Sequence, residues 1–243
     1  MMRHGTALVI LPTFNEVENL EPMVQAILRQ DLGLHILVVD DNSPDGTGLL
    51  ADRLASRYVE VHVLHRPRKL GLGPAYIAGF RWALARDYAY VFEMDCDFSH
   101  NPATLPVFLE EIVRAELVIG SRYMPGGSTP DWPPLRRMTS RFGNLYARAL
   151  LGLQVRDATS GFRCYRRALL AQIPWDKITL RGYGFQVAAV FHAEQLGARI
   201  LEVPITFRDR RAGKSKMTMA IALEAFLYVL RLALTQTQRI DVA

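Results

Sequence analysis

The chain has 243 residues, of which 50% are hydrophobic and 22% are charged, and its formal net charge is +5. This composition supplies enough apolar side chains for a sizeable core and argues against a largely disordered chain. The positive charge favours an anionic partner without choosing among phosphate groups, nucleic acid and a lipid surface. Two cysteines cannot form a disulfide framework and have no zinc-site spacing, so a reducing, cytoplasmic compartment fits best.

No segment of the sequence is expected to cross a membrane. The apolar run at residues 7–11 is too short for the core of a signal peptide. The most apolar stretch, residues 217–234, is interrupted by Glu224 and Arg231, whereas a spanning helix needs about 20 mostly apolar residues. Such a stretch can reach a lipid surface, but we do not expect it to span one.

Short apolar runs predict buried strands at residues 8–11, 36–39, 61–64, 90–94, 117–119 and 200–203. Apolar side chains at helical spacing predict helices at residues 20–28, 44–57, 74–86, 102–114, 136–151 and 185–196. Asn15 followed by Glu18 resembles a capping box at the start of the first helix. Ser43 with Pro44 suits the start of the second helix.

Strands and helices that alternate in this way predict βαβ crossovers, and therefore a mostly parallel central sheet with helices on both faces. We expect one α/β domain over residues 1–216 and a C-terminal amphipathic helical tail over residues 217–243. In such sheets ligands bind beyond the carboxyl ends of the strands. Polar clusters follow the first, second and fourth predicted strands, at residues 12–16, 40–41 and 95–97. This edge of the sheet should hold the functional site.

Asp95 and Asp97 are candidate metal ligands. At this spacing on an extended chain both carboxylates point to the same side. Two adjacent carboxylates repel one another unless they share a proton or a cation, and oxygen ligands suit Mg²⁺ or Mn²⁺. A solvated turn after the strand would explain both residues without a metal, and the pattern alone does not decide between the two interpretations.

The segment after the second predicted strand could serve a nucleotide or be an ordinary turn. Asn42, Pro44, Asp45 and Gly46 all favour turns, and an acidic residue at the position of Asp41 can accept hydrogen bonds from a ribose or a base. The first strand–helix connection lacks the Gly-x-Gly-x-x-Gly pattern, and the sequence has no P-loop motif. A redox enzyme that binds a dinucleotide is therefore disfavoured.

Two groups of basic residues could meet an anion. Arg136, Arg137 and Arg141 lie with Ser140 near the start of a predicted helix, where cations are unfavourable unless an anion is bound. Basic residues also crowd residues 208–216; such runs are usually solvated, and a phosphate clamp is the alternative. Nucleic acid is not expected as a partner, because aromatic residues are not interleaved with the basic ones as stacking platforms.

A series of motifs occurs in order along the chain, at residues 11–16, 39–47, 70–73, 94–100, 120–123, 159–163, 182–186 and 202–205. Together they resemble the family-2 inverting glycosyltransferases, and within them the dolichyl- and polyprenyl-phosphate mannosyltransferase branch. The resemblance implies a nucleotide-diphosphate-sugar transferase domain of the GT-A type that uses Mg²⁺ or Mn²⁺. It also implies transfer of mannose from GDP-mannose to a polyprenyl (dolichyl-type) monophosphate with inversion.

The resemblance implies roles for individual residues as well. The guanosine pocket would be lined by Pro12, Phe14, Glu16, Val39 and Asp41. The diphosphate and its metal ion would be held by Asp95, Cys96 and Asp97, with Ser99 as a weak metal ligand. The acceptor phosphate would be received by Arg122, Arg136 and Ser140. The diphosphate would be covered by Arg210 and Lys216. Asp97 and Arg122 would be the catalytic residues.

Three positions depart from the family's usual pattern. Phe14 stands where Tyr is usual, Cys96 replaces a more usual Ala, and Val187 with Ala188 follows Gln186 where relatives often carry a carboxylate. The last departure argues against a general base at that place. The implied chemistry does not need one, because a lipid monophosphate is already ionised near neutral pH.

Two other functions remain open from the sequence. The enzyme could use another sugar, such as glucose from UDP-glucose, or the chain could be a non-catalytic subunit that binds a nucleotide sugar. The tail also allows two placements. It could rest among headgroups as an interfacial helix, with the protein peripheral on the cytoplasmic face of a membrane. Alternatively, it could pack against the sheet or against a membrane-embedded partner subunit.

Overall fold

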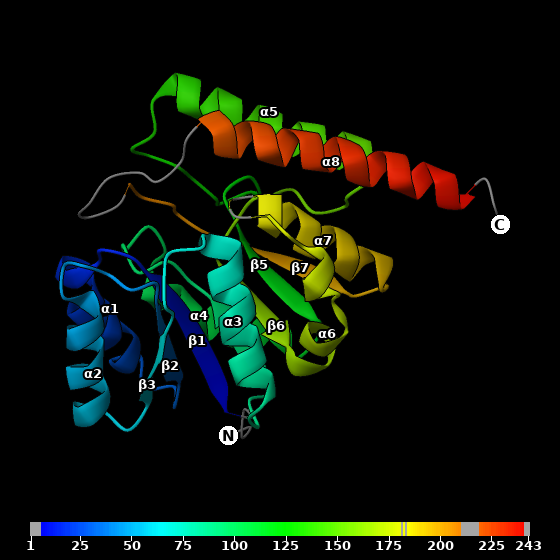
Figure 1. The fold of residues 1–243 in the computed structure, drawn as a ribbon. Helices are drawn as coiled ribbons and strands as arrows, with labels where there is room; N and C mark the ends of the chain where they lie inside the picture. Colours follow the sequence, from blue (N-terminus) through cyan, green and yellow to red (C-terminus); the bar gives the residue numbers. More distant parts are fainter. Residues whose placement is uncertain (1–5, 181, 183, 210–218, 241–243) are drawn as a thin grey trace.

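A seven-stranded sheet forms the centre of the fold (Figure 1), and the computed structural model describes residues 6–180, 182, 184–209 and 219–240. The strands are β1 (Ala7–Thr13), β2 (His35–Asp40), β3 (Val61–His65), β4 (Tyr90–Glu93), β5 (Leu117–Ser121), β6 (Arg163–Arg166) and β7 (Ile200–Pro204). They lie in the order β3-β2-β1-β4-β6-β5-β7. Only β6, among these strands, runs antiparallel to its neighbours, β4 and β5. The predicted α/β class with a mostly parallel sheet is confirmed.

Seven α-helices lie between the strands along the described chain, and α8 follows the last strand. They are α1 (Val17–Leu28), α2 (Thr47–Arg57), α3 (Leu72–Leu84), α4 (Leu105–Ile112), α5 (Pro134–Leu151), α6 (Arg167–Gln172), α7 (Gly184–Gln195) and α8 (Met219–Ile240). Two short 3-10 helices, η1 (Pro102–Thr104) and η2 (Trp175–Lys177), complete the described elements. All six predicted strands and six predicted helices are present, whereas β6 and α6 were not predicted.

The predicted start of the first helix is wrong. The helix begins at Val17, its N-cap is Glu16, and no side chain caps it from that position. Asn15 lies in the left-handed region at φ 58° and uses its backbone N–H to bond the Ser43 hydroxyl over 3.1 Å. It therefore belongs to the preceding turn and does not form a capping box with Glu18.

The second helix also begins later than expected, at Thr47 and not at Ser43 and Pro44. The Asp45 carboxylate explains both helix starts, because it accepts hydrogen bonds from the backbone N–H of Thr47 at 3.0 Å and of Val17 at 3.2 Å. Desolvation opposes ionisation, but these bonds outweigh it and lower the pKa of Asp45. A capping carboxylate shared by two helices cannot be recognised from local spacing alone.

The apolar core occupies both faces of the sheet. Along β1, Leu8 and Ile10 belong to one buried cluster and Val9 and Leu11 to the other, as the period of a strand requires. Helices α3, α6 and α7 cover the first face, and α1, α2 and α4 cover the second. The sheet is therefore buried on both sides, and its carboxyl edge remains for ligands.

Helices α5 and α8 lie side by side beyond that edge and cross over α7 (Figure 1). The Tyr146 ring stacks on Phe226 with centroids 4.4 Å apart, and its hydroxyl donates to the Phe226 carbonyl over 3.1 Å. At Gly184 a Cβ would lie 3.1 Å from the Ala225 Cα, so glycine allows α7 and α8 to approach closely. The expected C-terminal helix is thus present, although the proposed domain boundary at residues 216 and 217 lies outside the described residues.

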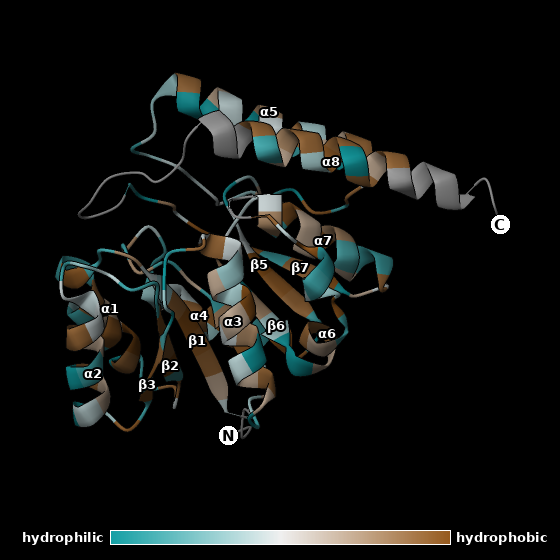
Figure 2. Ribbon diagram, in the orientation of Figure 1, coloured by the Kyte–Doolittle hydropathy of each residue, from teal (hydrophilic) through white to brown (hydrophobic). Residues whose placement is uncertain are grey.

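Figure 2 shows hydrophobic residues along both α5 and α8. Among the side chains that the structure describes on these helices, the exposed large apolar ones are Leu135, Met138, Phe142, Leu145, Leu150, Leu223, Phe226, Leu227, Leu230 and Leu234. We call this set the α5/α8 apolar surface. Among the described residues, no helix combines the length and hydropathy that a membrane span requires.

Candidate active site

A cavity of about 320 Å³ lies beside the carboxyl ends of β4 and β5. Four residues expected at the site line it: Asp95, Arg122, Arg136 and Ser140. Asp95 follows β4, Arg122 follows β5, and the other two come from α5. The fold therefore brings Asp95 to the same hollow as Arg122, Arg136 and Ser140, which are far from it in the sequence. Cys96, Asp97 and Ser99 do not line this cavity.

The cavity has a second, apolar part. Its wall there is formed by Phe142 and Tyr146 from α5, Val187 from α7, and Phe226 and Val229 from α8. The same hollow can thus receive a charged headgroup at one end and a hydrocarbon chain at the other. This combination is expected of a site for an amphipathic substrate.

The acidic cluster lies in a turn. Asp97 is 6% exposed, and its Oδ1 accepts the backbone N–H of Ser99 over 3.0 Å. The chain turns at Cys96 and Asp97, and Phe98 lies in the left-handed region at φ 63°. The extended chain that we expected between the carboxylates is therefore wrong, because the strand ends at Glu93.

The buried His100 side chain forms a hydrogen bond to the backbone of this turn. It is 2% exposed, its Nδ1 accepts the backbone N–H of Asp95 over 3.1 Å, and its ring stacks on Phe162. Burial lowers the pKa of His100 to about 4, so the imidazole is neutral near pH 7 and can accept this bond. The ring fixes the backbone that carries the acidic cluster.

The donor set at this turn suits a hard divalent cation. Asp95 and Asp97 supply carboxylate oxygens, and Ser99, which is 4% exposed, adds a hydroxyl. Among the described residues no group of three or more His, Cys, Asp or Glu side chains could hold a metal ion. Two carboxylates nevertheless suffice for Mg²⁺, which commonly takes its other ligands from substrate phosphates and water.

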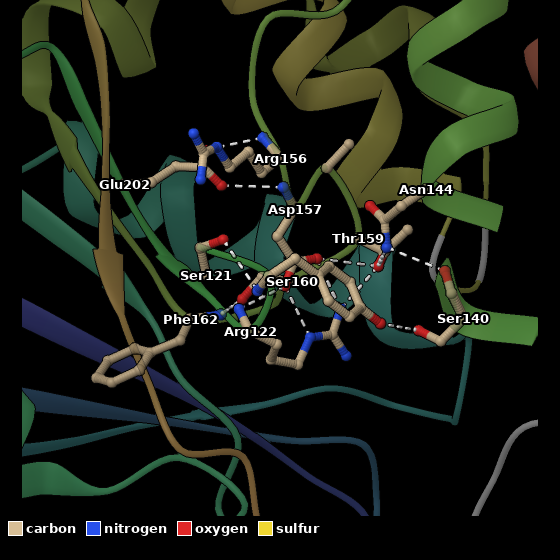
Figure 3. A network of polar contacts seen from close by, with 12 residues as sticks. Ser121, Arg122, Ser140, Asn144, Arg156, Asp157, Thr159, Ser160, Phe162 and Glu202 are labelled. Atoms are coloured by element: carbon tan, nitrogen blue, oxygen red, sulfur yellow. Dashed lines mark hydrogen bonds and ion pairs between the residues drawn. The ribbon is translucent and has the colours of Figure 1, made fainter. Parts of the chain in front are cut away.

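Arg122 is held by a buried carboxylate (Figure 3). Asp157, at 0% exposure, accepts hydrogen bonds from the Arg122 backbone N–H at 3.0 Å, Nε at 2.8 Å and Nη2 at 2.7 Å. Burial alone would raise the pKa of Asp157, but the Arg122 charge and these bonds lower it below its ordinary value. The pair is therefore ionised and fixes the guanidinium at the cavity wall.

Helix α5 contributes the other basic residue. The Arg136 guanidinium lies 4.2 Å from the centre of the Trp132 ring, and its Nη1 is 2.5 Å from Oδ1 of Asp209. Both partners of this ion pair are nearly half exposed, so the pair itself contributes little stability. Arg136 can therefore turn to another anion at modest cost.

The residues expected around guanosine cluster at the ends of β1 and β2. Phe14 is half-buried, and the Lys69 ammonium lies 4.1 Å from the centre of its ring. Asp41 is 4% exposed and pairs with Arg66 Nη1 at 2.6 Å. Burial raises the pKa of Asp41, although Arg66 opposes this shift. Arg66 and Lys69 were not singled out from the sequence.

The remaining predicted residues fall into three groups. Pro12 is half-buried and pairs in register with Val39, whose side chain is fully buried in the core. Glu16 is buried and accepts a hydrogen bond from Asn19 over 2.8 Å, and Cys96 is 3% exposed. Arg210 and Lys216 lie outside the described residues.

Sequence reasoning missed several residues that line the cavity or contact the residues that line it. Tyr123 and Thr159 stand inside motifs that carry the family resemblance, which was the available signal for them. Nothing in the scatter of six histidines distinguishes His100. Asp157 was missed because its importance depends on an ion pair formed across 35 residues of chain.

A second buried network lies beneath the acidic turn. Glu93, the last residue of β4, is 0% exposed and accepts a hydrogen bond from the Gln186 amide. Arg163, also 0% exposed, donates to the Gln186 carbonyl at 2.9 Å and to the Tyr165 hydroxyl at 3.3 Å. Burial raises the pKa of Glu93 to about 6, although the Arg163 charge and the Gln186 bond oppose the shift.

Comparison with solved structures identifies the fold. Glucosyl-3-phosphoglycerate synthase from Mycobacterium tuberculosis, in complex with Mn²⁺, UDP and glucosyl-3-phosphoglycerate, superposes with a TM-score of 0.67 at 22% identity, over 94% of this chain and 80% of that one. A mannosyltransferase from Pyrobaculum calidifontis, in complex with GDP-Man and Mn²⁺, gives 0.58 at 18% identity, over 100% and 76%. These likenesses confirm the GT-A fold.

Comparison of sequences identifies the family. The chain is 52% identical to an undecaprenyl-phosphate mannosyltransferase from Micrococcus luteus, over 92% of either chain. It is 47% identical to a polyprenol monophosphomannose synthase from Mycolicibacterium smegmatis, over 91% of this chain and 84% of that one. The sequence profile of glycosyl transferase family 2 matches residues 8–173. The protein therefore belongs to glycosyl transferase family 2.

Proposed function

We propose that the protein transfers mannose from GDP-mannose to a polyprenyl monophosphate, giving polyprenyl β-D-mannosyl phosphate and GDP. The observation that carries this proposal is the single cavity that joins Asp95, Arg122 and Arg136 to an apolar wall from α5, α7 and α8. The names of the two similar mannosyltransferases support the sugar and the acceptor class. The GDP-Man complex of the Pyrobaculum mannosyltransferase supports the donor.

The chemistry needs orientation more than proton transfer. An ionised oxygen of the acceptor phosphate forms a bond to C1 of mannose, while the bond from C1 to the diphosphate oxygen breaks and its electron pair leaves with GDP. Attack on the face opposite the leaving group inverts C1. A Mg²⁺ or Mn²⁺ ion held by Asp95 and Asp97, with Ser99 as a weak ligand, would stabilise the charge that develops on the diphosphate.

The side chains of the protein then have separate tasks. Arg122, fixed by Asp157, and Arg136 with Ser140 would hold the acceptor phosphate in line with C1. The guanosine would bind where Phe14 and Asp41 lie. Arg210 and Lys216 are assigned to the diphosphate on the family resemblance alone.

One incubation tests the function. The protein is mixed with radiolabelled GDP-mannose, Mg²⁺ and a short polyprenyl phosphate, and the organic phase is analysed for a mannosyl phosphate lipid. Parallel reactions contain UDP-glucose, or omit the acceptor. Transfer from UDP-glucose in place of GDP-mannose would overturn the donor assignment. Tight binding of GDP-mannose without any lipid product, under varied metals and acceptors, would favour the non-catalytic subunit.

Replacing Arg136 with alanine is expected to raise the KM for polyprenyl phosphate by about tenfold or more, because a hydrogen bond to a charged group contributes about 1.5–3 kcal/mol. The Kd for GDP should stay nearly unchanged, since the donor binds elsewhere. Arg137→Ala is the matched control, because Arg137 is an exposed neighbour on the same helix. Equal losses of GDP and lipid-phosphate binding would contradict this division of tasks.

We propose further that the protein is peripheral on the cytoplasmic face of a membrane and contacts it through the α5/α8 apolar surface. Among the side chains described on these two adjacent helices, ten large apolar ones are exposed, a density that is typical of an interaction surface. The apolar part of the cavity lies between the same helices, so an acceptor lipid could enter from the bilayer. A membrane-embedded partner subunit is the alternative occupant.

The double substitution Leu145→Glu and Leu227→Glu is expected to abolish co-flotation with vesicles. The two side chains are 61% and 54% exposed, and burying a leucine contributes about 1.5–3 kcal/mol. Leu49→Glu is the control, because Leu49 is 68% exposed on α2. Unchanged flotation of the double variant would contradict membrane contact. Absent flotation of the unaltered protein would favour the partner subunit.

A further inference from the structure

The phosphate-binding corner of the cavity is formed by two separate parts of the fold. Arg122 stands at the end of β5, whereas Ser140 belongs to α5, and both line the cavity. If either part shifts, the two groups no longer converge on one phosphate. Some feature of the structure must therefore hold the strand end and the helix in register.

The first connection runs through Asp157 and Thr159 (Figure 3). Asp157 binds the Arg122 guanidinium through both of its carboxylate oxygens. The Thr159 hydroxyl accepts hydrogen bonds from Arg122 Nη2 at 2.8 Å and from Asn144 Nδ2 at 2.9 Å. Since Asn144 is a buried residue of α5, one hydroxyl joins the strand end to the helix.

The second connection is the Tyr123 hydroxyl. It donates a hydrogen bond to the Ser140 Oγ over 2.7 Å, so the residue next to Arg122 orients the serine that faces the same cavity. A serine hydroxyl that accepts from Tyr123 has its own proton directed elsewhere and can donate it to an anion. Tyr123 thereby sets which way Ser140 donates.

The segment that carries Asp157 is itself held by hydrogen bonds to β7. Glu202, on β7, accepts hydrogen bonds from the backbone N–H of Arg156 at 2.8 Å and of Asp157 at 2.9 Å. The Trp132 and Phe207 rings lie 5.4 Å and 5.5 Å from the Arg122 guanidinium carbon. The guanidinium is thus restrained by bonds in its plane and by rings around it.

We infer that Asp157 and Tyr123 are positioning residues that preform the acceptor-phosphate corner, Asp157 through Arg122 and Tyr123 through Ser140. The inference rests on the proposed function, since it concerns the same acceptor. Neither residue needs to touch the substrate. Each residue affects catalysis only through the side chain that it orients. If that side chain is replaced, substitution of the positioning residue should have no further effect.

A double-mutant cycle on Tyr123 and Ser140 tests the inference. Tyr123→Phe deletes one hydroxyl and is expected to raise the KM for polyprenyl phosphate about fivefold, the size of one hydrogen bond. The kcat and the Kd for GDP should change by less than about twofold. In a Ser140→Ala background the same substitution should have no further effect on KM. Tyr88→Phe is the control, since the Tyr88 hydroxyl bonds His35.

Asp157→Asn provides the second cycle. It keeps the volume but removes the charge facing Arg122, and it is expected to lower kcat/KM for the lipid phosphate at least about tenfold. That loss should disappear in an Arg122→Ala background. Thermal denaturation shows whether the Asp157→Asn variant is folded. If it is not, the Tyr123 double-mutant cycle alone tests the inference.

Binding of a short polyprenyl phosphate, measured by calorimetry without donor, separates this inference from the proposed function. Weaker lipid binding by Tyr123→Phe, with unchanged GDP binding, supports it. Additive effects in the cycles, equal loss of GDP and lipid binding, or unchanged lipid binding would overturn it. If the unaltered protein binds the lipid phosphate but makes no mannosyl phosphate, the proposed function fails while the positioning role stands.

Discussion

Replacing Asp97 with alanine is expected to lower mannosyl transfer by about a thousandfold in buffer that contains Mg²⁺ or Mn²⁺, a loss of ~4 kcal/mol of transition-state stabilisation. Asp97 is buried in the turn after β4, two residues beyond Asp95, which lines the cavity. Without its carboxylate the ion would keep a single protein carboxylate, and the charge on the departing GDP would be poorly compensated. The measurement is kcat with saturating GDP-mannose and polyprenyl phosphate.

Two further measurements separate a metal role from a general loss of structure. The first is the affinity for GDP with and without Mn²⁺: Asp97→Ala should weaken GDP binding only when the ion is present. The second uses Asp97→Asn, which keeps an oxygen that can accept the Ser99 backbone N–H: its unfolding midpoint should stay near that of the unaltered protein while transfer is still lost. Asp87→Ala, at an exposed carboxylate elsewhere, controls for lost charge. Turnover that persists in the Asp97 variant with metal present would disprove the metal role.

The sheet could be predicted from the sequence because its strands are buried on both faces. Runs such as Leu8–Leu11 and Ile36–Val39 consist of apolar residues only, and burial of both faces requires that composition. The positions of Asp41 and Asp95 then follow, because parallel strands place their carboxyl ends at one edge. The local sequence was sufficient to predict these strands because their burial shows directly as an unbroken apolar run.

Strand β6 could not be predicted for the opposite reason. Its sequence, Arg163-Cys164-Tyr165-Arg166, begins and ends with a cation, which normally argues against a central strand. Arg163 is nevertheless fully buried, because carbonyl groups and the Gln186 segment surround its guanidinium. A buried cation is stable only with partners supplied by distant segments, and local periodicity does not reveal them.

The cavity wall around Arg122 was only partly predicted, also because of long-range contacts. The resemblance pointed to Arg122, Arg136 and Ser140, which the cavity brings together. It did not reveal Asp157, whose carboxylate is fully buried and accepts hydrogen bonds from Arg122. The apolar character of α8 was evident from the sequence, whereas its pairing with α5 depends on contacts such as that of Tyr146 with Phe226.

Substitution of the buried Arg163 should therefore destabilise the fold strongly. Arg163→Met is expected to lower the free energy of unfolding by about 3–5 kcal/mol, because removing one member of a buried charged network leaves the other uncompensated. Besides losing its bonds to the Ser160, Ala158 and Gln186 carbonyls, the variant leaves the Glu93 carboxylate without its nearby cation. Urea denaturation at pH 8 measures the loss.

The pH dependence of the unfolding free energy measures the contribution of the buried Glu93 carboxyl group. Its pKa is raised from 4.5 to about 6 in the folded protein, so folding favours the protonated form. This contribution to stability is fully present below about pH 4.5 and is lost as the pH rises through about 6, for a total of about 2 kcal/mol. Glu93→Gln has no such group and should lack that pH-dependent loss.

Between pH 4.5 and pH 8 the unaltered protein should therefore lose about 2 kcal/mol of unfolding free energy relative to the Glu93→Gln variant. Neutral His100 affects both proteins alike, so it cancels in the difference. In the Arg163→Met background the shift should be larger, because the cation that opposes the rise in the Glu93 pKa is gone. A difference that does not change with pH would show that Glu93 is ionised at little cost, and that Arg163 stabilises the fold through its carbonyl partners alone.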